Sequence, residues 1–283
     1  MSGLLSGLES LGLGNLENMS LYENAKEKEK TKEAQQKEAV VEEQDLLFDK
    51  TFTCTACDKE FKNKTVRIGK AKLLGSDVDL RPKYEYVDLI KYDVVMCPHC
   101  GYAALSRYFK FLTSGQLKMI KTNISQNFKS NFKDHDIYTY EEALERYKLA
   151  LANAIVKRAK ASEKAYICLK TGWLLRGMGE QLDKNDKEYT AKKEECLKQE
   201  NEYLKNALEG FMAARQSEAF PMCGMDEMTV DYLIAVLAMR FGQYDISSKL
   251  LSGIILAKNA NPRMRDKARD LKEVLMKKIK EES

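Results

Sequence analysis

The chain has 283 residues, of which 44% are hydrophobic and 32% are charged, and its formal net charge is +4. This length exceeds one typical domain, so we expect two folded units and a tail. Because positive and negative side chains are nearly balanced, the composition argues against a protein that binds polyanions over its whole surface. The sequence also lacks the run of roughly 18 apolar residues that a membrane helix needs.

The seven cysteines are typical of a protein in a reducing compartment. Four of them form two C-x-x-C motifs. The other three, Cys168, Cys196 and Cys223, stand singly in helical sequence, where we expect them to be small buried or half-buried side chains. The N-terminal residues lack the basic segment and the uninterrupted apolar run of a signal peptide. We therefore expect a cytoplasmic protein without a targeting segment.

Residues 1–22 place Leu4, Leu8 and Leu11 at helical spacing, but glycines and serines interrupt the pattern. This segment is either a frayed tail or a leucine-rich peptide that docks on a partner or on the protein's own helical domain. Residues 23–45 are rich in Glu, Lys and Gln and have almost nothing to bury. We expect them to form a solvated, low-complexity linker.

A small antiparallel zinc ribbon is expected over residues 46–112. From Leu46 the sequence LLFDKTFTC favours a strand that leads into the first C-x-x-C motif. Residues 65–68 and 72–74 are short strand candidates, and the apolar run 87–96 is expected to be a strand that delivers the second motif. After this motif the apolar residues recur every three or four positions, which predicts a helix over residues 102–112.

Cys54, Cys57, Cys97 and Cys100 are the candidate metal ligands. Two thiolates in one C-x-x-C turn can bind one ion, and two such turns supply the four sulfurs of a tetrahedral Zn²⁺ site. Gly101 fits this interpretation because the turn around the metal needs a positive φ after the second pair. We therefore predict one structural zinc ion. Four protein ligands leave no position for water, so the site is not expected to be hydrolytic.

Cys97 and Cys100 also match a second chemistry. The sequence Cys-Pro-His-Cys occurs at the active site of certain disulfide oxidoreductases, and a position between a strand and a helix would lower the pKa of a thiol. However, the further strands and the cis-proline loop of a thioredoxin-like fold are missing downstream, and the first motif would stay unexplained. A thiol-disulfide redox protein is therefore the second alternative.

The two histidines are not expected to bind a metal. His99 occupies a non-ligand position inside the second motif, and His135 lies between two aspartates in a sequence that favours a polar turn. The chain offers no Ser, His and Asp set from which a nucleophilic active site could be built. We therefore expect that the protein is not an enzyme.

Residues 113–283 are expected to form an all-α, tetratricopeptide-like repeat domain. Ala143, Ala207 and Ser247 are small residues, each followed four positions later by a large apolar one, which suits helices that cross closely. These anchors are 64 and 40 residues apart, where an ideal array keeps about 34, so the repeats are degenerate. Residues 263–280 are predicted to form a terminal capping helix. Together with the ribbon, this domain predicts an α+β fold.

Residues 50–137 carry 16 Lys or Arg against 9 Asp or Glu. Basic and aromatic side chains of this region could bind single-stranded nucleic acid through phosphate contacts and base stacking. They are Arg67, Lys70, Lys72, Arg81, Lys83, Tyr84 and Tyr86. An ordinary lysine-rich surface would explain the same surplus. A nucleic-acid-binding accessory factor is therefore the first alternative function.

The segments from Phe48 to Cys54 and from Cys97 to Ala104, followed by repeat-like helices, resemble a bacterial family known only as domain of unknown function twenty-two twenty-five. The resemblance runs from about Leu46 to the C-terminus. It supports the expected architecture and implies no catalytic residue, because the family lacks an assigned activity. We therefore expect a zinc-stabilised, non-catalytic scaffold or adaptor whose helical repeats bind a protein or peptide partner.

Overall fold

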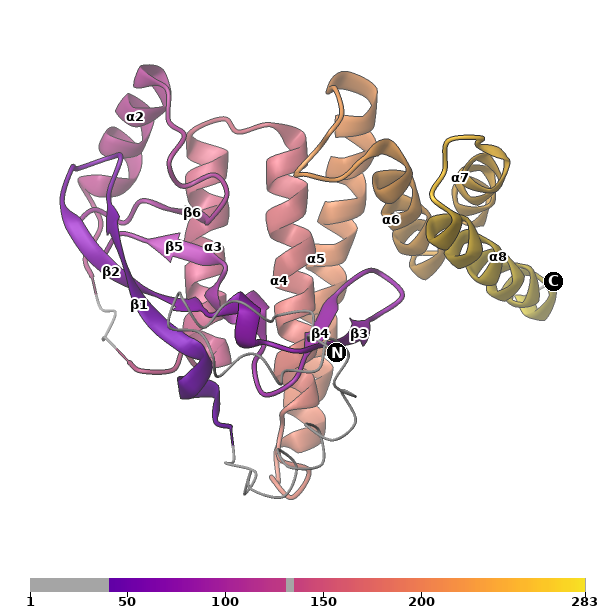
Figure 1. The fold of residues 1–283 in the computed structure, drawn as a ribbon, viewed down its shortest axis with the longest axis horizontal. Coiled ribbons are helices and arrows are strands. Elements are labelled where there is room, and N and C mark those ends of the chain that lie inside the picture. The colour runs from indigo at the N-terminus through magenta and orange to yellow at the C-terminus, as the bar shows by residue number, and fades with distance from the viewer. Residues whose placement is uncertain (1–40, 131–134, 283) are drawn as a thin grey trace, which may run out of the picture. The chain divides into compact units, whose positions relative to one another are not determined.

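The computed structural model of the chain describes residues 41–130 and 135–282. The described residues from Glu42 onward belong to one compact unit. The leucine-rich peptide over 1–22 and most of the linker over 23–45 lie outside the described residues. At the end of that linker, residues Glu43–Leu46 form the 3-10 helix η3. Figure 1 shows how the elements that follow η3 are arranged.

The strands form three separate antiparallel hairpins. Strand β1 Leu47–Thr53 pairs with β2 Glu60–Val66, β3 Leu73–Ser76 with β4 Pro82–Tyr84, and β5 Val94–Met96 with β6 Ala103–Leu105. In the first hairpin, Phe52 lies opposite Phe61, and both side chains are buried. Neighbouring strand residues point to opposite faces, so this register places both rings on the core side of the hairpin.

Two sequence-based predictions around the second motif are wrong. The run 87–96 is a strand only at its end, because Asp88 accepts a hydrogen bond from Ile90 N (2.9 Å) and starts the 3-10 helix η5 Leu89–Tyr92. Residues 102–112 contain no helix. Their apolar residues instead form β6, which pairs with β5, and the turn that follows it. Pairing between strands overrides the local apolar spacing in this segment.

The helices begin later than the sequence predicts. They are α2 Ser114–Ile120 with the π-helical turn η6 Lys121–Ser125, α3 Tyr140–Val156, α4 Ala161–Glu180, α5 Tyr189–Ser217, α6 Glu227–Arg240, α7 Tyr244–Leu256 and α8 Pro262–Glu282. A short 3-10 helix, η4 Ile68–Lys70, follows β2. Small antiparallel sheets followed by helices make the fold α+β, as predicted. Helix α8 covers the predicted capping segment.

Helices α3, α4 and α5 lie side by side, and α6, α7 and α8 follow beyond α5 (Figure 1). Helices α4 and α5 approach each other closely at Gly172, where a Cβ would lie 2.7 Å from a methyl group of Leu204. The small anchor residues Ala143, Ala207 and Ser247 are fully buried. The interpretation of these helices as tetratricopeptide-like repeats stays a prediction.

The β5–β6 hairpin and the helices share one hydrophobic core. Tyr147 of α3 donates its hydroxyl to Ile90 O (3.0 Å), and Asn153 of α3 donates its side-chain amide to Gly101 O (3.0 Å). These bonds fix α3 against the second cysteine motif. A second core lies between α6, α7 and α8.

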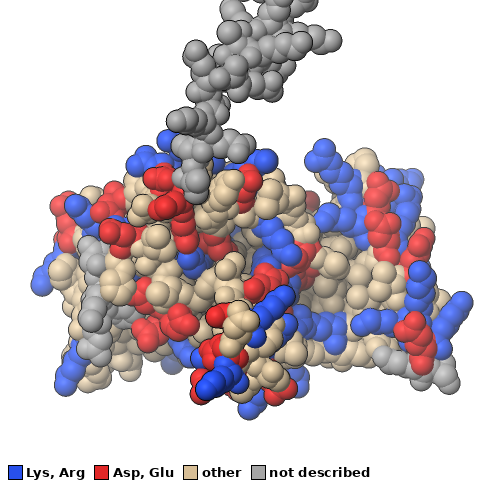
Figure 2. All heavy atoms as spheres, turned by 90° about the horizontal axis from the view of Figure 1, so that it is seen from below, with Lys and Arg blue, Asp and Glu red and all other residues tan. Residues whose placement is uncertain are grey.

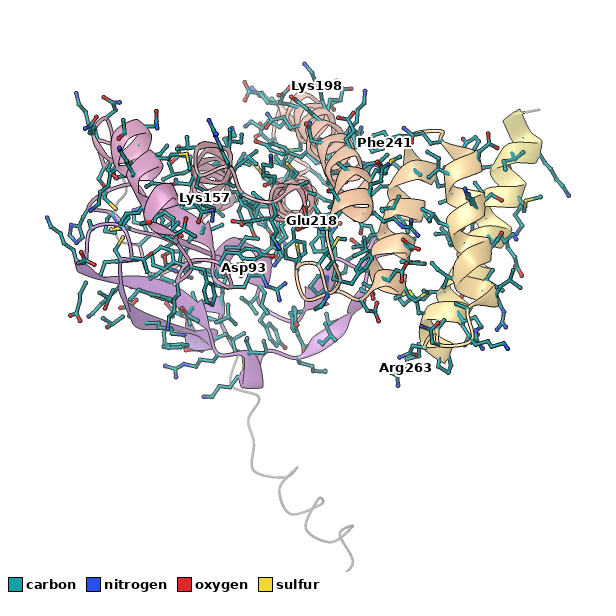
Figure 3. The ribbon with its side chains drawn as sticks, turned by 90° about the horizontal axis from the view of Figure 1, so that it is seen from above. Asp93, Lys157, Lys198, Glu218, Phe241 and Arg263 are labelled. Atoms are coloured by element: carbon teal, nitrogen blue, oxygen red, sulfur yellow. The ribbon has the colours of Figure 1, made fainter. Side chains whose placement is uncertain are left out.

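Polar contacts tie the start and the middle of α4 to its neighbours. Asp93, just before β5, accepts from the ammonium group of Lys170. Glu218 follows the end of α5 (Figure 3). It accepts from the backbone N–H (3.0 Å) and the hydroxyl (2.5 Å) of Ser162 at the start of α4. A carboxylate at a helix N-terminus satisfies backbone donors that have no partner inside the helix.

Candidate metal centre

The two C-x-x-C motifs occupy the turns of two hairpins. Cys54 and Cys57 lie between β1 and β2, and Cys97 and Cys100 lie between β5 and β6. Both turns have the same backbone hydrogen bonds, since the residue four positions after the first cysteine donates its N–H to the carbonyl of that cysteine, at 2.8 and 3.0 Å. The sequence therefore builds the same turn twice.

The residues that follow the two cysteine pairs adopt left-handed backbone conformations. Asp58 has φ 60° and Gly101 has φ 72°. Glycine adopts this region without strain, and aspartate does so more readily than most residues. A Cβ at position 101 would also lie 2.5 Å from ring atoms of Phe128. The prediction of a positive φ at Gly101 is confirmed.

The two turns face each other and bring the four sulfur atoms together, all within 4.8 Å of one another. The Sγ atoms of Cys54 and Cys100 are 3.6 Å apart, and those of Cys57 and Cys97 are 3.7 Å apart. Cys57 is half-buried, and the other three side chains are buried. This group of thiols could hold a metal ion.

The thiols of this cluster change one another's acidity. Hydrogen bonds from Cys100 and Cys54 lower the pKa of Cys97 to about 2. Hydrogen bonding to Cys100 and Cys97, together with burial, raises the pKa of Cys54. The contact of Cys100 with Cys54 lowers its pKa, but the contact with Cys97 and burial outweigh this effect and raise it to about 12. One thiol of the cluster is therefore more acidic than its neighbours, and a cation would favour ionisation of the others.

A cluster of aromatic rings supports both turns. Phe109 is fully buried, and its ring centroid lies 4.9 Å from Tyr102, 5.9 Å from Phe52 and 5.8 Å from Phe61. Its carbonyl oxygen accepts from the hydroxyls of Thr55 and Tyr102, both at 3.1 Å. Residues from both hairpins therefore meet at Phe109, which holds the two turns in place.

The remaining histidines and cysteines lie outside the sulfur cluster. His99 is exposed, and its Nε2 atom is 3.3 Å from Glu60 O. His135 Nδ1 is 2.5 Å from a carboxylate oxygen of Glu142. Cys168, Cys196 and Cys223 are buried, and burial raises the pKa of each of these thiols. Low thiol reactivity is expected of buried cysteines with raised pKa values.

The backbone around Cys97 and Cys100 differs from the one that the redox alternative assumed. The motif lies between β5 and β6, whereas a strand followed by a helix was expected. Within the part of the chain that the structure describes, no helix therefore begins directly after this motif to stabilise a catalytic thiolate. The acidity of Cys97 comes instead from the other cysteines, mainly Cys100.

Several cations of the expected nucleic-acid surface have acidic partners inside the protein. Arg81 is only 4% exposed, and its guanidinium pairs with Asp77 (2.8 Å) and Glu180 (2.5 Å). Lys83 also pairs with Asp77, and Lys72 pairs with Glu85. Figure 2 shows acidic and basic side chains interspersed on the face that it displays. Nucleic-acid binding stays a prediction, and these pairs do not favour it.

Sequence reasoning missed a buried ion-pair cluster that joins the β3–β4 hairpin to the helices. Arg176 of α4 contacts Asp77 and Asp79 of this hairpin and Glu200 of α5, with distances between 2.6 and 3.0 Å. Trp173 of α4 is buried and donates its indole N–H to Asp79 (3.0 Å). These partners are distant in the sequence, so no local pattern indicated that they would meet.

Among residues 41–130 and 135–282, no helix combines the length and the apolar character needed to cross a bilayer. Searches of curated proteins and of solved structures each found no match to this chain. A family model matches residues 47–275, which include both cysteine motifs and most of the helices. The chain therefore belongs to the bacterial family described as "Uncharacterized protein conserved in bacteria (DUF2225)".

Proposed function

We propose that the protein is a zinc-stabilised, non-catalytic scaffold or adaptor that binds a protein or peptide partner through its helices. The sulfur geometry supports zinc as the metal. Tetrahedral Zn²⁺ with Zn–S bonds of about 2.3 Å separates its sulfur ligands by about 3.8 Å. The Cys54–Cys100 and Cys57–Cys97 separations, 3.6 and 3.7 Å, are close to this value. Four thiols are also the donor set of many structural zinc sites.

A metal with four cysteine ligands has a structural role in this proposal. Cys54, Cys57, Cys97 and Cys100 would fill the coordination sphere, so no position remains for water or substrate. The ion would neutralise the buried thiolates and join two hairpins that share no strand pairing. Metal binding would therefore contribute to the folding free energy. The seven free cysteines suit a reducing cytoplasm, where such thiols persist.

The observation that carries the partner-binding proposal is a groove of about 840 Å³ formed by α3, α4 and α5. Apolar side chains lie along it: Leu151, Ile155, Ala161, Ala165, Cys168 and Ala213. Ile155 is 59% exposed although it lies within a helix. An exposed apolar groove between helices is a common docking site for peptide segments with apolar anchors.

The charged side chains along the groove indicate the chemistry of the partner. Glu195, Glu202 and Glu209 follow one another at intervals of seven residues, so they form a stripe on one side of α5. Lys148 and Lys164 line the groove on α3 and α4, and Lys198 lines it on α5 between Glu195 and Glu202. We therefore favour a partner segment with apolar anchors whose basic residues face the glutamates of α5.

Photo-crosslinking in bacterial cells tests this proposal. A photoreactive residue at position 155 is expected to capture one partner protein, whereas the same residue at position 256 is not. Leu256 is a suitable control because it is 80% exposed on α7 and does not line the groove. The captured protein, once purified, should bind the Ile155→Asp variant at least about tenfold more weakly than the wild-type chain and the Leu256→Asp variant as well as wild type. Equal capture at both positions, or equal affinity of both variants, would contradict the proposal.

A further inference from the structure

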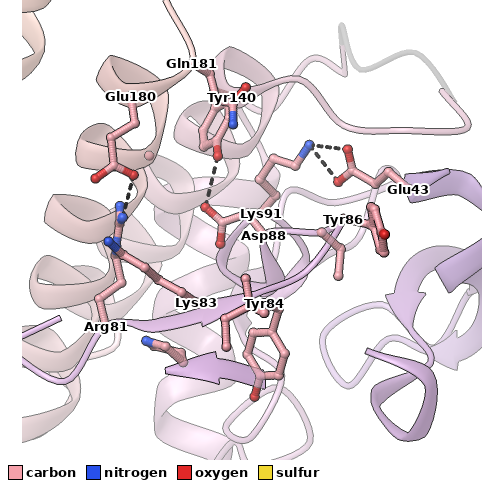
Figure 4. A pocket seen from close by; sticks show the side chains of 14 residues that line it. Glu43, Arg81, Lys83, Tyr84, Tyr86, Asp88, Lys91, Tyr140, Glu180 and Gln181 are labelled. Atoms are coloured by element: carbon pink, nitrogen blue, oxygen red, sulfur yellow. Dashed lines mark hydrogen bonds and ion pairs between the residues drawn. The ribbon is translucent and has the colours of Figure 1, made fainter. Parts of the chain in front are cut away.

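A second cavity, of about 590 Å³, lies where β4, the start of α3 and the end of α4 come together (Figure 4). Three tyrosines line it, Tyr84, Tyr86 and Tyr140, together with several charged side chains. The cavity lies apart from the sulfur cluster and shares no lining residue with the groove on α3, α4 and α5. Neither the metal nor the proposed peptide partner accounts for it.

Most charged groups around this cavity already have a partner of opposite charge. Lys91 pairs with Glu43 at 2.8 Å, and Arg81 pairs with Glu180 at 2.5 Å (Figure 4). Lys83 pairs with Asp77, which lies outside the cavity lining. An anionic ligand would have to compete with these carboxylates. The positive side chains therefore do not define an anion site.

Asp88 is the exception among these groups. Its Oδ1 atom accepts from Ile90 N (2.9 Å) and its Oδ2 atom from the Tyr140 hydroxyl (3.1 Å), and both donors are neutral. Among the described residues, no Lys or Arg forms an ion pair with this carboxylate. Burial raises the pKa of Asp88, because its negative charge is poorly solvated, although the nearby charges of Arg81 and Lys91 act in the opposite direction. Neither of these cations forms an ion pair with the carboxylate, so a cation that enters the cavity would supply a direct ion pair.

The Asp88 carboxylate packs closely against the backbone of α4 at one wall of the cavity. A Cβ at Gly177 would lie 2.9 Å from Asp88 Oδ2 and 2.9 Å from the Tyr140 hydroxyl oxygen, so a larger residue at this position would displace the hydrogen-bonded pair. Tyr86 lines the cavity with a side chain that is 57% exposed and a backbone φ of 64°. A bulky residue rarely adopts this left-handed conformation, and such strain is found most often at functional sites.

We propose that this cavity binds a small organic molecule with a protonated amine, whose ammonium group pairs with Asp88 and whose hydrocarbon part packs against Tyr84 and Tyr86. A carboxylate and tyrosine rings are complementary to an organic ammonium group through ionic and cation–π contacts. A metal ion would need several oxygen ligands, and only one carboxylate of the cavity lacks a cation. An organic ammonium ion needs only one such carboxylate.

Calorimetry with the full chain and two amines, tyramine and cadaverine, tests the proposal. Both amines should bind at millimolar concentration or below, whereas para-ethylphenol, which is tyramine without its amine, should not. The Asp88→Asn variant keeps a side-chain acceptor for Ile90 N and removes the charge, so amine affinity should fall about 10- to 100-fold. The exposed control Asp245→Asn should bind like wild type.

An independent readout covers the case in which Asp88→Asn does not fold. In wild-type protein, amide NMR signals of Ile90 and Gly177 should shift when tyramine is added, because these residues adjoin Asp88. The signal of Ile155 in the helical groove should not shift. The proposal is overturned if neither amine binds, if para-ethylphenol binds as tightly as tyramine, if folded Asp88→Asn retains full affinity, or if the shifts occur elsewhere.

Discussion

The substitution Arg176→Met removes the cation that joins the β3–β4 hairpin to α4 and α5. Arg176 donates to Asp79 (2.6 and 3.0 Å) and to Glu200 (2.9 Å), and the side chains of both acids are only 6% exposed. Removal of one partner from a buried ion pair costs about 3–5 kcal/mol. Asp79 keeps its bond from Trp173, and Glu200 keeps its bond from Arg240 (2.9 Å). We therefore expect the free energy of unfolding to fall by about 3 kcal/mol, the lower end of this range.

The assay is urea unfolding at neutral pH, followed in parallel by far-UV circular dichroism and by the fluorescence of Trp173, the single tryptophan. Arg269→Met is the matched control, because Arg269 pairs with Asp266 at 2.8 Å on the surface, where the two side chains are 54% and 66% exposed. This exposed pair should contribute less than about 1 kcal/mol. If both variants lose the same free energy of unfolding, the buried cluster does not join the hairpin to the helices as inferred.

Three further predictions concern pH, the turns and the aromatic cluster. Burial alone would raise the pKa of Asp77, but hydrogen bonds from neighbouring Lys and Arg side chains hold this pKa below its usual range. The ionised Asp77 therefore contributes to stability above about pH 4, and this contribution is lost at lower pH. The stability difference between wild type and Arg176→Met should therefore shrink in acid unfolding below about pH 4; a widening gap would refute this. Gly101 has a left-handed backbone, so Gly101→Ala should lower the free energy of unfolding by about 1–2 kcal/mol in thermal unfolding. Gly115→Ala should cause no such loss, because the space around Gly115 is open, and equal unfolding midpoints of the two variants would contradict this. Phe109→Ala should lose about 3–5 kcal/mol in urea unfolding, and a loss below about 1 kcal/mol would show that its ring does not hold the turns together.

The convergence of the four cysteines could be predicted from the sequence because each C-x-x-C motif is a local unit. The chemistry that requires two thiolates in one turn also requires the conformation of the residues that follow, as at Gly101. The remaining step, that the turn at Cys54 faces the turn at Cys97, followed from the ligand number of zinc. The aromatic support around Phe109 has no comparable spacing in the sequence.

Elements that depend on strand pairing or on a side-chain cap were not predictable from apolar spacing. Residues 102–112 have apolar spacing that suits a helix, but β6 forms there because β5 lies beside it. Asp88 starts a 3-10 helix inside an apolar run that resembles a strand. The helical domain was easier to predict, since its apolar periodicity is long, although the first long helix, α3, begins only at Tyr140.

The second candidate site was also beyond the sequence. Asp88 meets Tyr140 and Gly177, which are far away in the chain, and none of the three belongs to a recognisable motif. Arg81 shows the opposite error, because its place in a basic stretch suggested an exposed phosphate ligand. It is buried and pairs with Asp77 and Glu180. Composition indicates which charges a segment carries, but the fold decides which of them reach solvent.

Native mass spectrometry of the purified full chain tests the central claim most directly, namely that one zinc ion is bound by the four clustered cysteines. The wild-type chain should carry one zinc ion, and so should Cys168→Ser, because Cys168 is buried outside the cluster. Cys97→Ser should lose the ion or bind it much more weakly, with a lower unfolding temperature. A metal-free wild-type chain that unfolds at the same temperature with and without added zinc would contradict the account.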